Sequence, residues 1–218
     1  MAIITGPLLE ATDYRGYITR ITAKGDKPGK DGIKAKVILD NIESYLSEMQ
    51  EILEKDKPHV FSPYLECLHS KGRGKIPRII SKPALFDKII LSAVKDKLAA
   101  RLPLEIPFAL PNERIRQVVK SYYANWSENK NLIVAKYDVK QFYDNIPHNR
   151  LLNSLLDKGL EPSVLELVLS AIRTPTLSWK ERKDFTGKCS ITGVPQGLPI
   201  SNILATFYLN EIDKYAKS

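Results

Sequence analysis

Cysteine, histidine and long apolar runs are scarce in this sequence. Its 218 residues include two cysteines, Cys67 and Cys189, which lie far apart, and three scattered histidines. Neither a disulfide framework nor a zinc site of local ligand spacing can be built from them, which favours a reduced, cytoplasmic protein. No run approaches the ~18 apolar residues of a membrane span, and no charged stretch followed by an apolar segment opens the chain. We therefore expect neither a membrane span nor a signal peptide.

Positive charge is in excess. There are 33 Lys and Arg against 25 Asp and Glu, which gives a net charge of +8 and a pI of about 9.3. This balance favours a polyanionic partner such as nucleic acid. The length allows a substantial core in one large domain or two small ones.

The first half has mainly helical periodicity. Residues 22–36 are rich in Gly, Pro and Lys and predict a loop. From Ile33 to Leu53 apolar residues recur every three or four positions, which predicts one long amphipathic helix. A basic, glycine-containing turn then leads into a predicted strand at 78–81, and further helices begin near Pro83 and Pro111.

The second half mixes strands and helices. An apolar, β-branched strand is predicted at 132–139, a helix after Pro147, a second over 164–172, a β-hairpin near 176–192 and a helix after Pro199. The predicted fold class is α+β, with a small antiparallel sheet and packed helices.

The stretch AKYDVKQFYDNIPHNRLL, residues 135–152, places Asp138 at the end of the predicted strand and follows it with Phe142, Tyr143 and Asp144. A carboxylate there is fixed by the sheet yet exposed, so it can bind a divalent cation when a second carboxylate faces it. The alternative is that Asp138 and Asp144 merely end a strand and cap a helix.

A second motif, TGVPQGLPISNILATFYL, covers residues 192–209. Gly193 and Gly197 allow backbone conformations and close approaches that a Cβ blocks, Gln196 offers amide donors and acceptors, and a helix N-terminus follows. Such a turn can lie against a nucleotide. The alternative is a plain hairpin exit into a helix.

Residues 134–146 and 193–205, in this order, resemble two signature motifs of reverse transcriptases, especially the bacterial type of group II introns and related mobile elements. Upstream, GKDGIKAKVILDNIESYLSEMQEIL resembles their N-terminal segment and GKIPRIISKPALFDKIILSAVKDKL their first fingers motif. The resemblance implies a right-hand polymerase with a polar lead at 1–32, fingers at 33–130 and an incomplete palm at 131–218.

The resemblance also implies functions for single residues, and an RNA template, a nucleic-acid primer and deoxynucleoside triphosphates as partners. Two Mg²⁺ ions are implied as cofactors. The implied residues are Asp138 as catalytic metal ligand, the main-chain carbonyl of Val139 as its neighbour, Tyr143 beneath the sugar, Gln196 and Gly197 along nucleotide and template, Lys75 and Arg78 on the triphosphate, and Lys71 and Arg73 on RNA.

Two departures from the family pattern limit the assignment. Residues 106–119, IPFALPNERIRQVV, lack the Gly-Phe-Arg-Pro-like string of group II intron enzymes, so a retron-type or phage-defence enzyme is an alternative. No Asp-Asp pair occurs, so the Tyr-x-Asp-Asp motif that carries the other catalytic carboxylates is absent. We expect the 218-residue chain to be catalytically incomplete, and whether it is itself an enzyme stays open.

Two other functions compete with this interpretation. The chain can be a non-catalytic RNA-binding or assembly module built on a polymerase remnant, or an RNA-templated RNA polymerase in which Asp144 binds the ribose 2′-hydroxyl. Under the reverse transcriptase hypothesis we expect Asp138 and Gln196 to meet in one cleft. We also expect an exposed strand edge through which copies of the chain associate.

Overall fold

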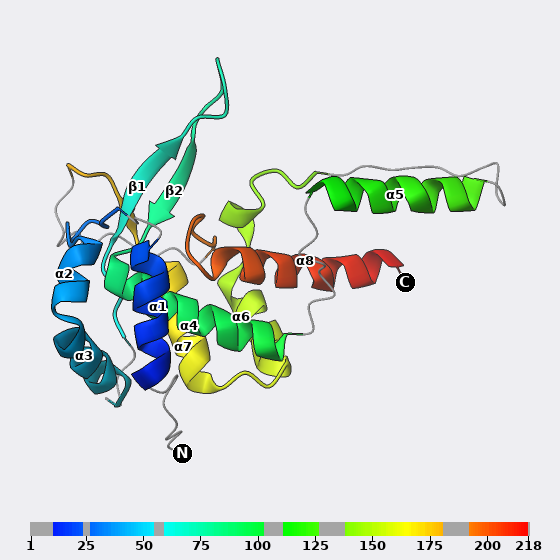
Figure 1. Ribbon diagram of the computed structural model, residues 1–218. Helices are drawn as coiled ribbons and strands as arrows, with labels where there is room; N and C mark the ends of the chain where they lie inside the picture. Colours follow the sequence, from blue (N-terminus) through cyan, green and yellow to red (C-terminus); the bar gives the residue numbers. More distant parts are fainter. Residues whose placement is uncertain are drawn as a thin grey trace.

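A central group of helices packs around and below a small twisted sheet in the computed structural model (Figure 1). The structure describes residues 11–23, 27–54, 59–102, 111–126, 138–180 and 192–217. The α+β class is confirmed. The elements are α1 (Ala11–Ala23), α2 (Ala35–Asp40), α3 (Ile42–Glu54), β1 (Tyr64–His69), β2 (Arg78–Lys82), α4 (Leu85–Arg101), α5 (Pro111–Trp126), the 3-10 turn η1 (Tyr143–Asn145), α6 (His148–Asp157), α7 (Pro162–Arg173), β3 (Thr176–Leu177) and α8 (Ser201–Lys217).

The sheet has three strands in the order β2-β1-β3. β1 and β2 form an antiparallel hairpin in which Cys67 lies opposite Ile80. β3 pairs with the other edge of β1 in the parallel direction, with Tyr64 opposite Thr176. The sheet is therefore mixed, which corrects the predicted antiparallel sheet. Strand β3 brings residues after α7 to the edge of the β1–β2 hairpin.

Helix α4 is the centre of the hydrophobic core. Leu91, Val94 and Leu98 are fully buried on it, and it contacts α1, α7 and α8. Leu155 on α6 and Leu204 on α8 belong to the same buried cluster. The stretches predicted as fingers and palm thus share one continuous core, so the same buried residues stabilise both of them.

Two helical predictions need correction. Helix α1 lies within the stretch predicted as a polar lead, and its Tyr14 and Ile18 are buried in the core. The single long helix predicted from Ile33 to Leu53 is two helices, α2 and α3, which are interrupted at Asn41. The Asn41 side-chain amide donates to the Val37 carbonyl at 2.9 Å, and such local bonding competes with the helical backbone.

The β-strand predictions are confirmed in part. The strand at 78–81 is β2, whereas β1 was not predicted, because only its first residue is buried and the rest mixes polar and apolar side chains. The predicted strand 132–139 falls mostly outside the described residues, and its last two positions, 138 and 139, have no regular structure. Much of the predicted hairpin at 176–192 also lies outside the described residues, and its beginning pairs with β1 as β3.

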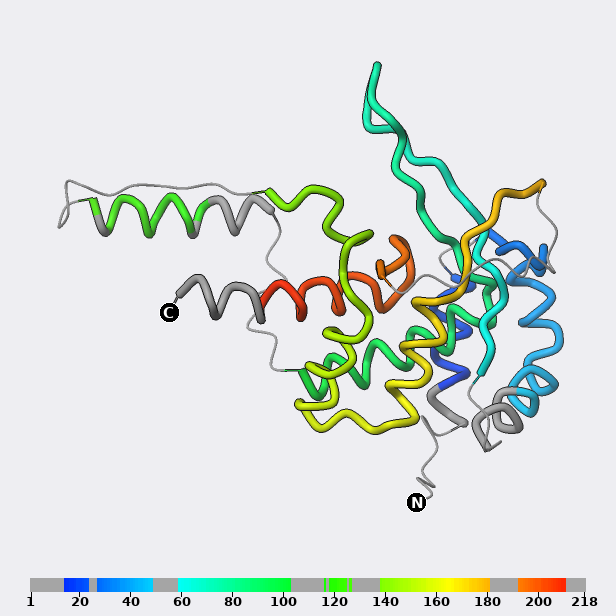
Figure 2. The backbone as a smooth tube through the Cα atoms, turned by 180° about the vertical axis from the view of Figure 1, so that it is seen from behind, coloured from blue at the N-terminus to red at the C-terminus, as the bar shows by residue number. Residues whose placement is uncertain are grey.

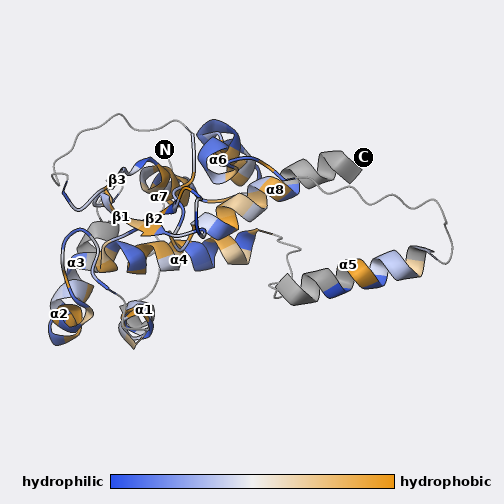
Figure 3. Cartoon of the chain, turned by 90° about the horizontal axis from the view of Figure 1, so that it is seen from above, coloured by the Kyte–Doolittle hydropathy of each residue, from blue (hydrophilic) through white to orange (hydrophobic). Residues whose placement is uncertain are grey.

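Two elements project from the helical body. The β1–β2 hairpin extends outward in both Figure 1 and Figure 2, and α5 stands apart from the other helices. Figure 3 shows hydrophobic positions along α5. Val118 and Tyr123 of this helix are exposed. The described helices include none with the length and apolar character needed to cross a bilayer.

One buried hydroxyl connects the sheet to α7. Tyr64 is fully buried, and its hydroxyl donates to the Ala171 carbonyl at 2.9 Å. We expect Tyr64→Phe to lower the free energy of unfolding by about 1 kcal/mol, because the hydrogen bond is lost while the ring is kept. Chemical denaturation checks this. The control Tyr123→Phe, at an exposed position, should change stability little; equal effects of both variants contradict the assignment.

Candidate functional site

The two signature motifs lie side by side through backbone hydrogen bonds. The Val194 amide donates to the Tyr143 carbonyl and the Gly193 amide to the Ile146 carbonyl, each at 2.8 Å. Pro147 and Thr192 form an antiparallel bridge next to these bonds. The segment after Asp138 and the segment before the Pro-Gln-Gly turn therefore form one short ladder. The ladder brings the two motif segments together next to Gln196, and it does not include Asp138.

Three elements hold the turn of residues 193–197 through its own carbonyl groups. The Gly193 carbonyl accepts from the His148 ring at the start of α6 at 2.7 Å. The Pro195 carbonyl accepts from the Ser201 hydroxyl of α8 at 2.5 Å, and the Gln196 carbonyl accepts from the Ser81 amide of β2 at 2.6 Å. The turn is thereby fixed to α6, α8 and the sheet at once.

The glycines of the turn allow these close contacts. Gly193 has a φ of +94° and lies against the Asp144 backbone, where a Cβ would come within 3.1 Å of the Asp144 carbonyl oxygen. Gly197 has a φ of +110°, and its Cβ would lie 2.5 Å from the Ile80 side chain. Both positions combine a left-handed backbone with close approach, which only glycine tolerates without strain.

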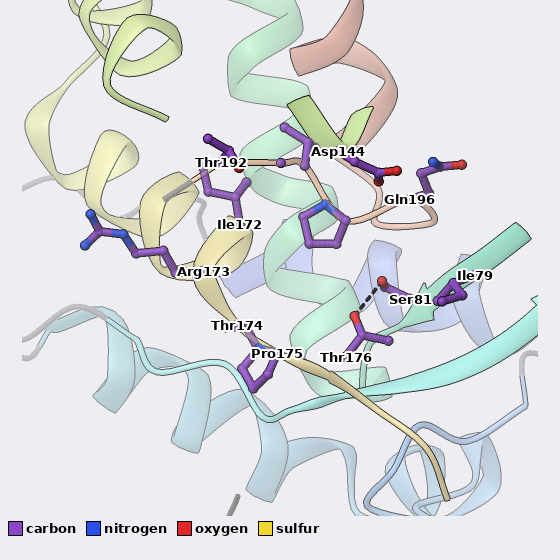
Figure 4. Close-up of a pocket in the computed structure, with 13 residues that line it drawn as sticks. Ile79, Ser81, Asp144, Ile172, Arg173, Thr174, Pro175, Thr176, Thr192 and Gln196 are labelled. Atoms are coloured by element: carbon purple, nitrogen blue, oxygen red, sulfur yellow. Dashed lines mark hydrogen bonds between the residues drawn. The ribbon is translucent and has the colours of Figure 1, made fainter. Parts of the chain in front are cut away.

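A pocket of about 370 Å³ opens between the turn, the sheet and the end of α7 (Figure 4). Ile79 and Ile172 supply apolar surface, and the hydroxyls of Ser81 and Thr176 bond to each other at 2.7 Å. The charged and amide side chains on its lining are those of Asp144, Arg173 and Gln196. Figure 4 shows Arg173 on the opposite side of the view from Asp144 and Gln196. Such a mixed lining suits a ligand with both apolar and hydrogen-bonding groups.

Tyr143 and Arg78 are brought together. Tyr143 lies half-buried in η1, and its ring packs edge-on against Phe142. Burial raises the pKa of the Tyr143 hydroxyl, and the positive charge of Arg78 partly opposes this rise. The first residue of β2 therefore acts electrostatically on the residue predicted to lie beneath the sugar.

Other predicted site residues lie apart from this group. Lys71, Arg73 and Lys75 are exposed in the turn at the far end of the β1–β2 hairpin. Asp138 is exposed and does not line the pocket of Gln196. The cleft predicted for Asp138 and Gln196 stays a prediction, as do the functions of the individual residues.

Sequence reasoning did not identify three residues that build the site. Ser81 contributes through its backbone amide, which no side-chain pattern reveals. His148 begins α6 shortly after residues 134–146, and Ser201 begins α8 within the second motif. Their side chains bond back to the 193–195 backbone. The available signal was their place immediately after Pro147 and within Pro-Ile-Ser, where helix-start side chains commonly satisfy nearby backbone groups.

The chain belongs to the reverse transcriptase family. The family described as reverse transcriptase (RNA-dependent DNA polymerase) matches residues 69–218, more than half of the chain. The match includes the β1–β2 hairpin turn, η1 and the Pro-Gln-Gly turn. A mixed helix and strand fold with a small sheet agrees with this family.

Its relatives indicate the group II intron type. The chain is 31% identical over 193 residues to an uncharacterized 91 kDa protein in the cob intron of Schizosaccharomyces pombe. This alignment covers 86% of the chain and 22% of that protein. It is 26% identical over 193 residues to the group II intron-encoded protein LtrA of Lactococcus lactis subsp. cremoris. This alignment covers 84% of the chain and 31% of LtrA. The chain thus spans less than a third of the length of either relative.

The close approach at Gly197 should be measurable as stability. We expect Gly197→Ala to destabilise the fold by roughly 2–4 kcal/mol, since it adds the cost of a left-handed backbone to a clash with β2. The control is Gly159→Ala, where φ is +72° but no atom lies within 4 Å of the added Cβ. That variant should lose only the ~1–2 kcal/mol of backbone strain. Equal losses, measured by denaturant unfolding, contradict the packing of the turn against β2.

Proposed function

We propose that this chain forms the fingers and the first part of the palm of an RNA-directed DNA polymerase. In this proposal residues 1–32 precede the fingers, residues 33–130 form the fingers and residues 131–218 contribute to the palm. The observation that carries it is the three-sided attachment of the 193–197 turn, because it brings the Pro-Gln-Gly motif, the Tyr143 segment and β2 to one place. The resemblance to the family implies a nucleotide-binding site built from these same three segments.

The proposed positions of a nucleotide follow from this arrangement. Tyr143 lies beneath the sugar, where its ring excludes a 2′-hydroxyl, and Gln196 and Gly197 line the nucleotide and the template. Arg78, whose charge acts on Tyr143, binds the triphosphate together with Lys75 of the hairpin turn. A positive side chain there neutralises phosphate charge, which favours binding and transfer.

The family chemistry implies two Mg²⁺ ions, and the described residues fit them only in part. The exposed Asp138 carboxylate and the neighbouring Val139 carbonyl offer oxygen donors, which Mg²⁺ prefers. Within the part of the chain that the structure describes, no three His, Cys, Asp or Glu side chains group as metal ligands. Two donors fall short of the six of an octahedral site. We therefore assign Asp138 the place of one contributing ligand.

A non-catalytic function is the second candidate, and the same shortage of described ligands favours it. In that case the chain binds RNA through its basic hairpin and assembles with other components. Both candidates share the nucleic-acid surface, and they differ in whether a nucleotide occupies the site at Tyr143 and Gln196.

Photochemical labelling distinguishes the two candidates. The chain is mixed with an RNA template annealed to a DNA primer, Mg²⁺ and a photoreactive deoxynucleoside triphosphate. We expect adducts at Tyr143 or Gln196, identified by mass spectrometry, and no primer extension, because the sequence contains no Asp-Asp pair. Adducts spread over the surface contradict the nucleotide site, and primer extension contradicts the expected incompleteness. An unlabelled ribonucleotide that competes as well as a deoxynucleotide favours the RNA polymerase alternative.

The hairpin should supply most of the RNA affinity. Reversing Lys71, Arg73, Lys75 and Arg78 to Glu should weaken RNA binding by at least about tenfold and flatten its salt dependence, because phosphate contacts release counterions. Fluorescence anisotropy at several salt concentrations measures both effects. The matched control reverses four exposed basic residues elsewhere, Lys34, Lys36, Arg101 and Arg150. An equal loss in both variants indicates that net charge alone, and not the hairpin, determines binding.

A further inference from the structure

His148 has a defined protonation state in this structure. Its side chain is 2% exposed, and Nε2 lies 2.7 Å from the Gly193 carbonyl oxygen. A carbonyl only accepts hydrogen bonds, so Nε2 must carry the proton. The other ring nitrogen, Nδ1, is buried without a hydrogen-bond partner among the described residues. The ring is therefore neutral, with its proton on Nε2 and a bare Nδ1.

This bond is one of the three that fix the 193–197 turn, and it differs from the other two. Ser201 and the Ser81 amide, which hold Pro195 and Gln196, do not titrate in the physiological range. His148 does. It also acts on Gly193, whose amide is already bonded to Ile146, so both polar groups of this residue are committed to the stretch 146–148.

We propose that His148 is a positioning residue that holds the Pro-Gln-Gly turn against the Tyr143 segment while it is neutral, and that its protonation loosens the nucleotide site. The proposal rests on the proposed function for its effect on ligand binding. The position of Gln196 is set at one end of the turn by the His148 bond to Gly193. A protonated ring keeps its Nε2–H donor to the Gly193 carbonyl, but its charge is buried and its Nδ1–H has no acceptor among the described residues. The charged ring therefore favours leaving this place, which releases the turn from α6 while α8 and β2 still hold it.

The surroundings of His148 oppose its protonation. Burial lowers the pKa of His148, the hydrogen bond to Gly193 partly raises it, and the positive charge of Arg173 lowers it further. The elements packed against α6 carry few other charges: Glu166 on α7 is exposed, and the described side chains 201–210 of α8 include no charged group. Asp144, beyond Gly193, and Arg150 and Asp157 on α6 itself are also exposed.

The sign of the pH effect follows. Because the pKa of His148 is lower in the folded chain than its ordinary value of about 6.5, the unfolded or loosened form binds more protons. The stabilisation is complete above pH ~6.5 and decreases as the pH falls from there through the folded-state pKa. A proton added to Nδ1 would have no acceptor among the described residues.

The first test follows the ring nitrogens of the unmodified chain by ¹⁵N NMR between pH 5 and 8. We expect the Nε2–H tautomer at neutral pH and titration below the ordinary histidine range. The backbone amides of Gly193 and Val194 should shift with the same midpoint. An Nδ1–H tautomer, or titration at or above the ordinary value, overturns the proposal. This readout needs no nucleic acid, so it is independent of the proposed function.

The second test compares the chain with His148→Gln, which retains an N–H donor but does not titrate, and with His148→Ala, which retains neither. Binding of an RNA template annealed to a DNA primer is measured by anisotropy at pH 7.5 and pH 5.5. Relative to the Gln variant, the unmodified chain should lose affinity severalfold at the lower pH, because only its ring at position 148 can take up a proton. The Ala variant should be weakened at both. The exposed neighbour Asn149→Ala is the control and should follow the unmodified chain.

The outcomes separate the two hypotheses. If the unmodified chain and His148→Gln have the same pH dependence, His148 has no positioning function and the proposal is wrong. If none of the variants binds the template and primer at any pH, the proposed function fails, while the NMR titration still decides the state of His148.

Discussion

The candidate site depends on the hydrogen bonds that the backbone carbonyl groups of the 193–197 turn accept. Val194 anchors the 193–197 turn in the hydrophobic core, but its Gly, Pro and Gln residues have little apolar surface that could fix them by packing. Instead its carbonyls at Gly193, Pro195 and Gln196 accept from α6, α8 and β2. Backbone acceptors buried at such a junction must be satisfied, so each donor restricts the turn in a different direction. The Gln196 side chain thereby remains available on the pocket lining.

The helical core makes this attachment precise. The three donors belong to elements that are far apart in sequence, and each is positioned by burial against other helices. Ser201 is itself buried, and Leu204 one turn later is fully buried in the common cluster around α4. His148 is followed by Leu151 and Leu155, which are fully buried as well. Apolar packing of rigid helices thus fixes polar groups that contact the turn, as pre-organised sites require.

The sequence predicted the elements whose signals are local. Periodicity identified α4, α6, α7 and α8, and the strand β2, and the two motifs were recognised before any contact was known. It missed α1, although Tyr14, Tyr17, Ile18 and Ile21 have helical spacing, because a glycine- and lysine-rich loop follows. It also missed β1, whose pairing with β2 and β3 supplies the stability that its mixed composition does not.

The residues of the candidate site likewise fall into those that the sequence predicted and those that it could not. Tyr143 and Gln196 could be identified because their side chains carry the proposed function. Gly197 could be identified because its position requires a residue without a Cβ. The donors that hold them could not, since Ser81 acts through its backbone and the parallel pairing of β3 joins residues more than a hundred positions apart. Such long-range contacts depend on how the whole core closes and leave no local pattern.

The charge distribution separates two tasks within the chain. The exposed Lys71, Arg73 and Lys75 lie on a projecting hairpin, where solvent screens them and they attract any polyanion. Arg78 is the first residue of β2 and pairs with His69 directly beside the hairpin turn. Its positive charge influences the phenol pKa of the half-buried Tyr143 despite its own exposure. The turn end of the hairpin therefore carries both solvent-screened charges and one charge that acts on Tyr143, and the β1–β2 pairing couples the two.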